Sequence, residues 1–183
     1  MEPALNREAR LDLYLDAVRG AVSAVPESTH REFVRGLHGA RQIVVAGRGR
    51  SGMVASAFAR RLGQMGLATW HLDDSTVPRL GAGDALVAAT GSGTTPTVLS
   101  LMQTARSGGA AVLAVTRAPA KPEVLAVTDV VAELRVPPGG TVFPLGTLFE
   151  AGLLAYLDQV VVDLLDALGK TEIELHERHT NLE

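Results

Sequence analysis

Cysteine is absent from the 183 residues of the chain. Its absence excludes disulfides, thiolate metal sites and a cysteine nucleophile, and it is typical of proteins from a reducing compartment. Aromatic residues make up only 4% of the sequence, and the formal net charge of -3 comes without a basic stripe. Because a basic stripe is the electrostatic footprint of nucleic-acid binding, we expect no nucleic-acid partner.

Long apolar runs free of charge are also missing. The N-terminus carries charges along its length and lacks the apolar core of a signal peptide. The most apolar long segment, 151–168, is interrupted by Asp158, Asp163 and Asp166, which argues against a membrane span. We therefore expect no membrane association and a cytoplasmic location.

The composition is that of one globular domain. Apolar residues account for 46% and charged residues for 20% of the chain, and a domain of this length buries about 70% of its unfolded surface. We expect a single domain over 1–183. It is divided into N-terminal helices at 1–40, an α/β core at 41–168 and a C-terminal helical tail at 169–183.

Short apolar runs alternate with helical patterns through the core. Strands are expected at Gln42–Ala46, Ala68–Leu72, Asp84–Ala89, Ala110–Val115 and Asp129–Leu134. Continuous apolar strands separated by helices are typical of a parallel sheet covered on both faces. The sequence therefore predicts an α/β fold, a three-layer sandwich in which helices flank a five-stranded parallel sheet, as in flavodoxin-like and Rossmann-like proteins.

Capping signals and apolar periodicity place the remaining helices. A first helix is expected over Ala4–Val25, and Thr29 with Glu32 has the capping-box spacing of a second helix that runs to about His38. The segment 151–168 has the clearest helical apolar face, and Gly169 is expected to end it. Thr171 with Glu174 offers a capping box for a short last helix.

A loop of small residues, Thr90–Thr95 (TGSGTT), separates the third strand from a helix beginning at Pro96. Proline suits a first helical turn because its missing N–H has no partner there, and the hydroxyl of Thr94 or Thr95 is expected to cap the helix. Glycines allow close backbone approach to a ligand, and the free N–H groups of a helix start favour an anion. The loop predicts a phosphate site, although a plain connecting turn has the same composition.

A second glycine loop, Gly47–Gly52 (GRGRSG), follows the first strand. Its spacing fits the dinucleotide fingerprint G-x-G-x-x-G, and Asp73 and Asp74 lie where the acidic partner of that fingerprint is required. Arg48, Arg50 and Ser51 equally suit a single phosphate or the hydroxyls of a sugar. A tight turn with solvated arginines is the third interpretation.

Three further residues are candidates for chemistry. Glu150, among the apolar residues of FPLGTLFE, could be a general base with a pKa raised by burial, or an acidic residue that complements a helix dipole. His176 and His179 have a metal-compatible spacing but no evident third ligand, so we expect no metal. Neither Ser51 nor Ser92 stands in a G-x-S-x-G nucleophile motif.

The loops GRGRSG and TGSGTTPT, with one strand between them, resemble those of the SIS (sugar isomerase) family. FPLGTLFE before an apolar helix and the ending ERHTNLE make the chain most similar to the 6-phospho-3-hexuloisomerases, which belong to the ribulose monophosphate pathway. The resemblance implies a subunit built on a five-stranded parallel sheet, and four such subunits usually assemble into a homotetramer. It also implies interconversion of D-arabino-hex-3-ulose 6-phosphate and fructose 6-phosphate without a cofactor.

The resemblance also assigns residues. It implies that Ser51 and the loop Ser92, Gly93, Thr94 and Thr95 hold the phosphate, that Glu150 moves a proton between sugar carbons through an enediol, and that His179 reaches the site from a neighbouring subunit. Gly49 and Arg50 belong to the same expected substrate site.

The chain departs from the family pattern in two places. Thr90 and Thr94 stand where the family loop commonly reads Ser and Glu, and Arg48 stands where a small residue is usual. A non-catalytic SIS module that binds a sugar phosphate is therefore the alternative, beside the dinucleotide-binding domain that the glycine spacing leaves open.

Overall fold

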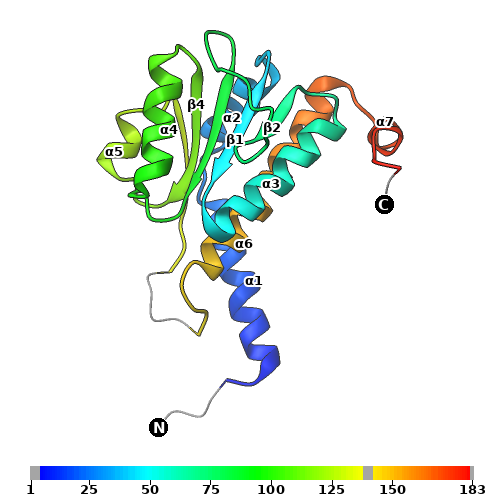
Figure 1. The fold of residues 1–183 in the computed structure, drawn as a ribbon. Coiled ribbons are helices and arrows are strands. Elements are labelled where there is room, and N and C mark those ends of the chain that lie inside the picture. Colours follow the sequence, from blue (N-terminus) through cyan, green and yellow to red (C-terminus); the bar gives the residue numbers. More distant parts are fainter. Residues whose placement is uncertain (1–4, 138–141, 182–183) are drawn as a thin grey trace.

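Five parallel strands form one sheet in the order β2-β1-β3-β4-β5 (Figure 1). The computed structural model describes residues 5–137 and 142–181. The strands are β1 (Ile43–Gly47), β2 (Thr69–His71), β3 (Ala85–Thr90), β4 (Ala111–Arg117) and β5 (Val130–Leu134). All are paired in parallel, so the predicted five-stranded α/β sandwich is confirmed.

Helices cover both faces of the sheet. They are α1 (Arg7–Ser23), α2 (Glu27–His38), α3 (Gly49–Gln64), α4 (Pro96–Ser107), α5 (Pro122–Leu125), α6 (Thr147–Leu168) and α7 (Glu172–Glu177). The larger core lies between the sheet and α2, α3 and α6, while a smaller core lies under α4 and α5. Apolar residues point to both sides along β1, β3 and β4, which explains their uninterrupted apolar runs.

The two predicted capping boxes have opposite outcomes. Thr171 and Glu174 form both hydrogen bonds of the box at the start of α7, as predicted. The box at Thr29 and Glu32 was wrong, because α2 already begins at Glu27 with Pro26 as its N-cap residue and no side-chain cap. The fixed φ of proline (here -61°) suits a helix start, so the helix begins earlier than the Thr29 signal indicated.

The first and last long helices differ from their predicted bounds. α1 begins at Arg7, within the predicted range, whose first residue lies outside the described part of the chain. α6 begins at Thr147, one turn before the predicted apolar segment, so that Glu150 lies in its first turn. Gly169 ends α6 in the left-handed conformation (φ 62°), as predicted.

Candidate active site

The loop from Thr90 to Thr95 turns tightly from β3 into α4. Thr90 Oγ1 accepts a hydrogen bond from the Gly93 N–H and Ser92 Oγ accepts one from the Thr94 N–H, both at 3.2 Å. Gly93 has φ 68°, which favours glycine. Thr95 is the N-cap residue of α4, but its hydroxyl makes no capping hydrogen bond and lies 3.3 Å from Ser92 Oγ instead. The expected hydroxyl cap is therefore wrong: α4 begins at Pro96, which has no N–H, and the Val98 N–H donates to the carbonyl oxygen of Thr95 at 3.0 Å instead of to a hydroxyl.

The loop from Gly47 to Gly52 brings two backbones into direct contact. A Cβ at Gly47 would lie 3.0 Å from the backbone of Gly52, so a side chain there would push β1 and α3 apart. Gly49 has φ 59° and begins α3. Arg50 and Ser51 therefore lie in the first turn of α3, where free N–H groups point out of the helix end.

Both loops lie where the strand order changes direction. β1 and β3 are parallel neighbours, with Gly47 paired with Ala89, and the chain leaves β1 for β2 on one side and β3 for β4 on the other. Ligands of open parallel sheets bind beyond the carboxyl ends of the strands at this point. α3 and α4 begin at this same edge on opposite faces of the sheet (Figure 1), so the two expected phosphate loops are neighbours.

Glu150 contacts the first of these loops. Arg50 Nε donates to Glu150 Oε2 at 2.5 Å across 100 positions of sequence. The Glu150 side chain is 13% exposed and that of Arg50 is 68% exposed. Gly146 leaves room for the carboxylate, because a Cβ there would lie 3.0 Å from Glu150 Oε1. Local sequence indicated Glu150 as a candidate but gave no signal for its arginine partner.

The second loop contacts the residue beside Glu150. A Cβ at Gly91 would lie 2.8 Å from Cδ1 of Phe149, whose side chain is buried. The start of α6 therefore packs directly on the loop after β3. Through Arg50 and Phe149, the carboxylate is tied to both glycine loops.

Both acidic residues named for a dinucleotide site accept hydrogen bonds from the chain itself. Arg48 Nη1 donates to Asp73 Oδ1 at 2.9 Å, and the Asp74 carboxylate accepts from the His71 N–H at 2.8 Å. The Asp73 side chain is 64% exposed, and its contact with Arg48 places it beside the glycine loop. Arg48 already balances the charge of this carboxylate.

His179 lies far from Glu150 within one chain. Arg178, its neighbour, packs against Gly66, which follows the C-terminal end of α3, whereas Glu150 pairs with Arg50 in the first turn of that helix. The 16 residues of α3 span about 24 Å at 1.5 Å per residue. Figure 1 shows the tail at the opposite end of α3 from the glycine loops. The chain does not itself bring His179 to the predicted site.

Metal-binding clusters and membrane-spanning helices are both missing from the described part of the chain. Among residues 5–137 and 142–181, no cluster of three or more His, Asp or Glu side chains has the arrangement of a metal site. Within the same residues, no helix has the length and apolarity needed to cross a membrane.

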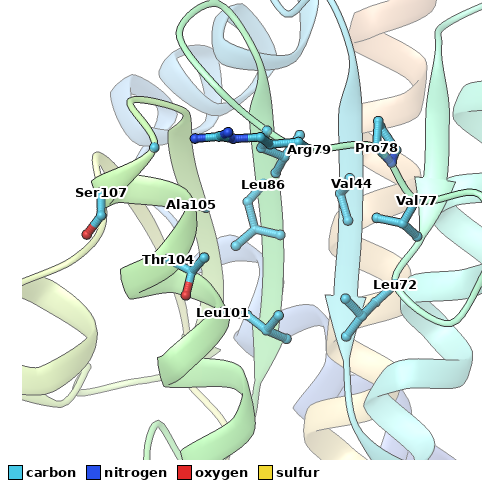
Figure 2. A pocket seen from close by; sticks show the side chains of 12 residues that line it. Val44, Leu72, Val77, Pro78, Arg79, Leu86, Leu101, Thr104, Ala105 and Ser107 are labelled. Atoms are coloured by element: carbon cyan, nitrogen blue, oxygen red, sulfur yellow. The ribbon is translucent and has the colours of Figure 1, made fainter.

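A cavity of about 440 Å³ lies away from the glycine loops. Figure 2 shows it between α4, the amino-terminal parts of β1 and β3, and the segment after β2, with Val44, Leu86, Leu101 and Arg79 among the residues that line it. Its walls come from the C-terminal half of α4 and not from its start. The cavity is therefore distinct from the candidate site at the carboxyl edge.

The SIS domain family matches residues 36–138, more than half of the chain. The chain belongs to the SIS family. The expectation from the two loops is thereby confirmed. A relative from Mycobacterium gastri named 3-hexulose-6-phosphate isomerase is 38% identical over 155 residues, which cover 79% of this chain and 78% of that protein.

Solved structures resemble nearly the whole chain. A Methanococcus jannaschii protein whose structure infers a molecular function of 3-hexulose-6-phosphate isomerase has a TM-score of 0.86 and 26% identity. The match covers 95% of this chain and 99% of that one. The Vibrio vulnificus NanR protein complexed with ManNAc-6P has a TM-score of 0.75 at 19% identity, covering 92% of this chain and 66% of that one. That last likeness shows the fold alone.

Proposed function

We propose that the chain is a sugar-phosphate isomerase that interconverts D-arabino-hex-3-ulose 6-phosphate and fructose 6-phosphate. The observation that carries the proposal is the contact of Glu150 with Arg50 at the edge where both glycine loops end. The similarity to relatives named 3-hexulose-6-phosphate isomerase supports this choice of substrate.

The phosphate binds at the starts of α3 and α4. Gly49 and Gly93 let the backbone come close to the anion, and Ser51, Ser92, Thr94 and Thr95 supply hydroxyls at the positive ends of the two helices, which favour an anion. Holding the phosphate away from the reacting carbons fixes their position relative to Glu150. Binding energy from the unreactive end of the sugar is thus used for orientation.

Glu150 transfers the proton. Its carboxylate removes the proton from C2 of the hexulose, beside the C3 carbonyl, and the C2–H electron pair forms the C2–C3 double bond while the carbonyl oxygen gains a proton. The resulting 2,3-enediol loses the proton of its O2 hydroxyl as the C2 carbonyl forms, and Glu150 returns its proton to C3. The Arg50 guanidinium donates hydrogen bonds to the oxygen on which charge develops.

His179 completes the site from a neighbouring subunit. Because the tail lies at the far end of α3 in its own chain, the histidine meets Glu150 only if a second copy presents it. There it moves protons between the O2 and O3 oxygens or assists ring opening. A homo-oligomer, which we expect to be a tetramer, is therefore part of the proposed site.

Fructose 6-phosphate labelled with ¹³C at C2 tests the reaction. Isomerisation converts the labelled ketose carbon into a secondary alcohol carbon, which ¹³C NMR resolves, and unphosphorylated labelled fructose serves as the control that does not react. Calorimetric titration of the same protein measures binding. Binding without conversion would favour the non-catalytic sugar-phosphate module, and the absence of both would contradict either function.

A further inference from the structure

The proposed phosphate loop has no charge of its own. Thr90–Thr95 contain no charged side chain, whereas a phosphate monoester carries about -1.5 to -2 at neutral pH. The two arginines of the other glycine loop already have carboxylate partners, Arg48 in Asp73 and Arg50 in Glu150. A further cation beside the loop would balance the charge of the bound substrate.

Lys121, the N-cap residue of α5, packs its side chain on this loop. A Cβ at Gly93 would lie 2.8 Å from Lys121 Cγ and 3.3 Å from Lys121 Cβ. The ammonium is only three bonds beyond Cγ, which keeps it within reach of an anion bound over Gly93. Across residues 5–137 and 142–181, Lys121 has no ion-pair partner, so its charge is not committed to a carboxylate.

The segment that carries Lys121 is fixed to the sheet. The Ala118 N–H donates to the carbonyl oxygen of Leu134 at 2.9 Å, and the Ala120 N–H donates to the Glu133 carboxylate at 3.0 Å. Val124, one turn further along, is buried and also lies beside Gly93. The position of Lys121 relative to the loop is therefore set by β5 and by the smaller core, not by a free surface turn.

We propose that Lys121 is a phosphate-binding residue that makes the site select phosphorylated over neutral ketoses. The inference rests on the proposed function, because that function places the phosphate at the loop after β3. A lysine suits this role as a compact charge with three rotatable donors. Its contribution is to substrate binding, since it lies at the phosphate end and not at the reacting carbons.

Chemical labelling tests the contact without any substitution. The chain contains only two lysines, Lys121 and Lys170, and Lys170 is paired with Glu174 in the tail. Limited acetylation by an N-hydroxysuccinimide ester, followed by peptide mass spectrometry, gives the rate of acetylation at each lysine. We expect inorganic phosphate or fructose 6-phosphate to slow labelling of Lys121 about fivefold and to leave Lys170 unchanged. Equal labelling of Lys121 with and without both anions would overturn the proposal.

Kinetics test the consequence for the substrate. Lys121→Met keeps the apolar stem and removes the charge, and we expect KM to rise about tenfold with kcat within about twofold, because a charge-assisted hydrogen bond is lost. Lys121→Arg should restore most of the affinity, and Lys170→Met is the matched control. An unchanged KM in Lys121→Met would contradict the assignment.

The two proposals fail in different ways. If the wild-type protein does not isomerise the sugar while phosphate still protects Lys121, the enzymatic function is wrong and the anion site stands. If the protein isomerises the sugar without protection and with unchanged KM in Lys121→Met, only the role of Lys121 is wrong.

Discussion

Asp84 is buried at the amino end of β3, and three neighbours hold its carboxylate. Burial by itself raises the pKa of Asp84, but hydrogen bonds from Gln42, from the Gly81 N–H and from Arg41, together with the Arg41 charge, outweigh it and hold the pKa below its usual value. A carboxyl group whose pKa falls on folding stabilises the protein above its unfolded pKa. That stabilisation is lost as the pH falls through the folded pKa.

We therefore expect Asp84→Asn to lower the free energy of unfolding by about 2 kcal/mol at pH 7, the scale of hydrogen bonds to a charged group. The difference from wild type should begin to shrink below about pH 4, where an aspartate of the unfolded chain gains its proton, and should go on shrinking as the pH falls toward the lower pKa of the folded Asp84. Urea unfolding at pH 7, 5 and 3 measures this difference in the free energy of unfolding. The control is Asp158→Asn, which changes an exposed aspartate. A difference that stays constant to pH 3 would show that the charge is not its cause.

Individual site residues were predictable only where their signal is local. The small residues of the two loops and the position of Glu150 before an apolar helix could be read directly. The contacts that join them could not, because Arg50 and Glu150 are 100 positions apart and no periodicity links them. Lys121 was missed for the same reason, although its place after the apolar run of β4 indicated the correct edge of the sheet.

At the scale of elements, α6 packs on the loop after β3 at Gly91. Gly91 faces the ring of Phe149, and Glu150 is the next residue along α6. A side chain at Gly91 must therefore displace either the loop or the first turn of α6. The position of the phosphate loop and the position of Glu150 thus depend on the same contact between Gly91 and Phe149. That contact joins two elements, so neither element alone determines it.

Gly91→Ala tests this coupling. Because its Cβ would lie 2.8 Å from Phe149 Cδ1, we expect kcat to fall at least about tenfold as Glu150 shifts relative to the bound sugar. The control is Gly63→Ala in α3, where a Cβ meets nothing within 4 Å and should leave kcat unchanged. Steady-state kinetics measure both, and a wild-type kcat in Gly91→Ala would contradict the coupling.

Strands were easier to predict than helix starts. The apolar runs of β1, β3 and β4 are buried on both faces, so their composition alone identifies them. At α2 two local signals competed, and Pro26 determined the start instead of the spacing of Thr29 and Glu32. At α7 no proline precedes Thr171 to start the helix earlier, and the predicted capping box forms.

The whole molecule exposes apolar surface on its first helix. Figure 1 shows α1 extending beyond the body of the fold, and Leu11, Leu13 and Leu15 are each about half exposed. Within one chain, Ala21 is the one residue of α1 that is buried. Leu11 and Leu15 are four residues apart and share one face of the helix, and a partner subunit packed on that face would cover both.

The proposed shared site predicts the behaviour of tail variants. Deletion from Thr171 onward should dissociate the proposed oligomer and abolish isomerisation, because it removes α7 and His179 together. Light scattering after size exclusion and the ¹³C assay measure the two effects. An active monomer after this deletion would contradict the shared site.

Mixed oligomers test the sharing directly. Glu150→Gln and His179→Ala should each be inactive alone, while oligomers formed from both should regain activity, because some sites then combine an intact Glu150 with an intact His179 from the partner. Mixing Glu150→Gln with itself under the same conditions is the control. A mixture of the two variants that exchanges subunits and stays inactive would contradict the shared site.

Isomerisation by Glu150→Gln is the most direct measure of the central claim, that the carboxylate beside Arg50 carries the proton. The substitution preserves the shape of the side chain. We expect turnover of ¹³C-labelled fructose 6-phosphate to fall at least about 100-fold, the scale of general-base catalysis, while calorimetric affinity for the sugar phosphate stays within a few-fold of wild type. Turnover near the wild-type rate in this variant would contradict the account.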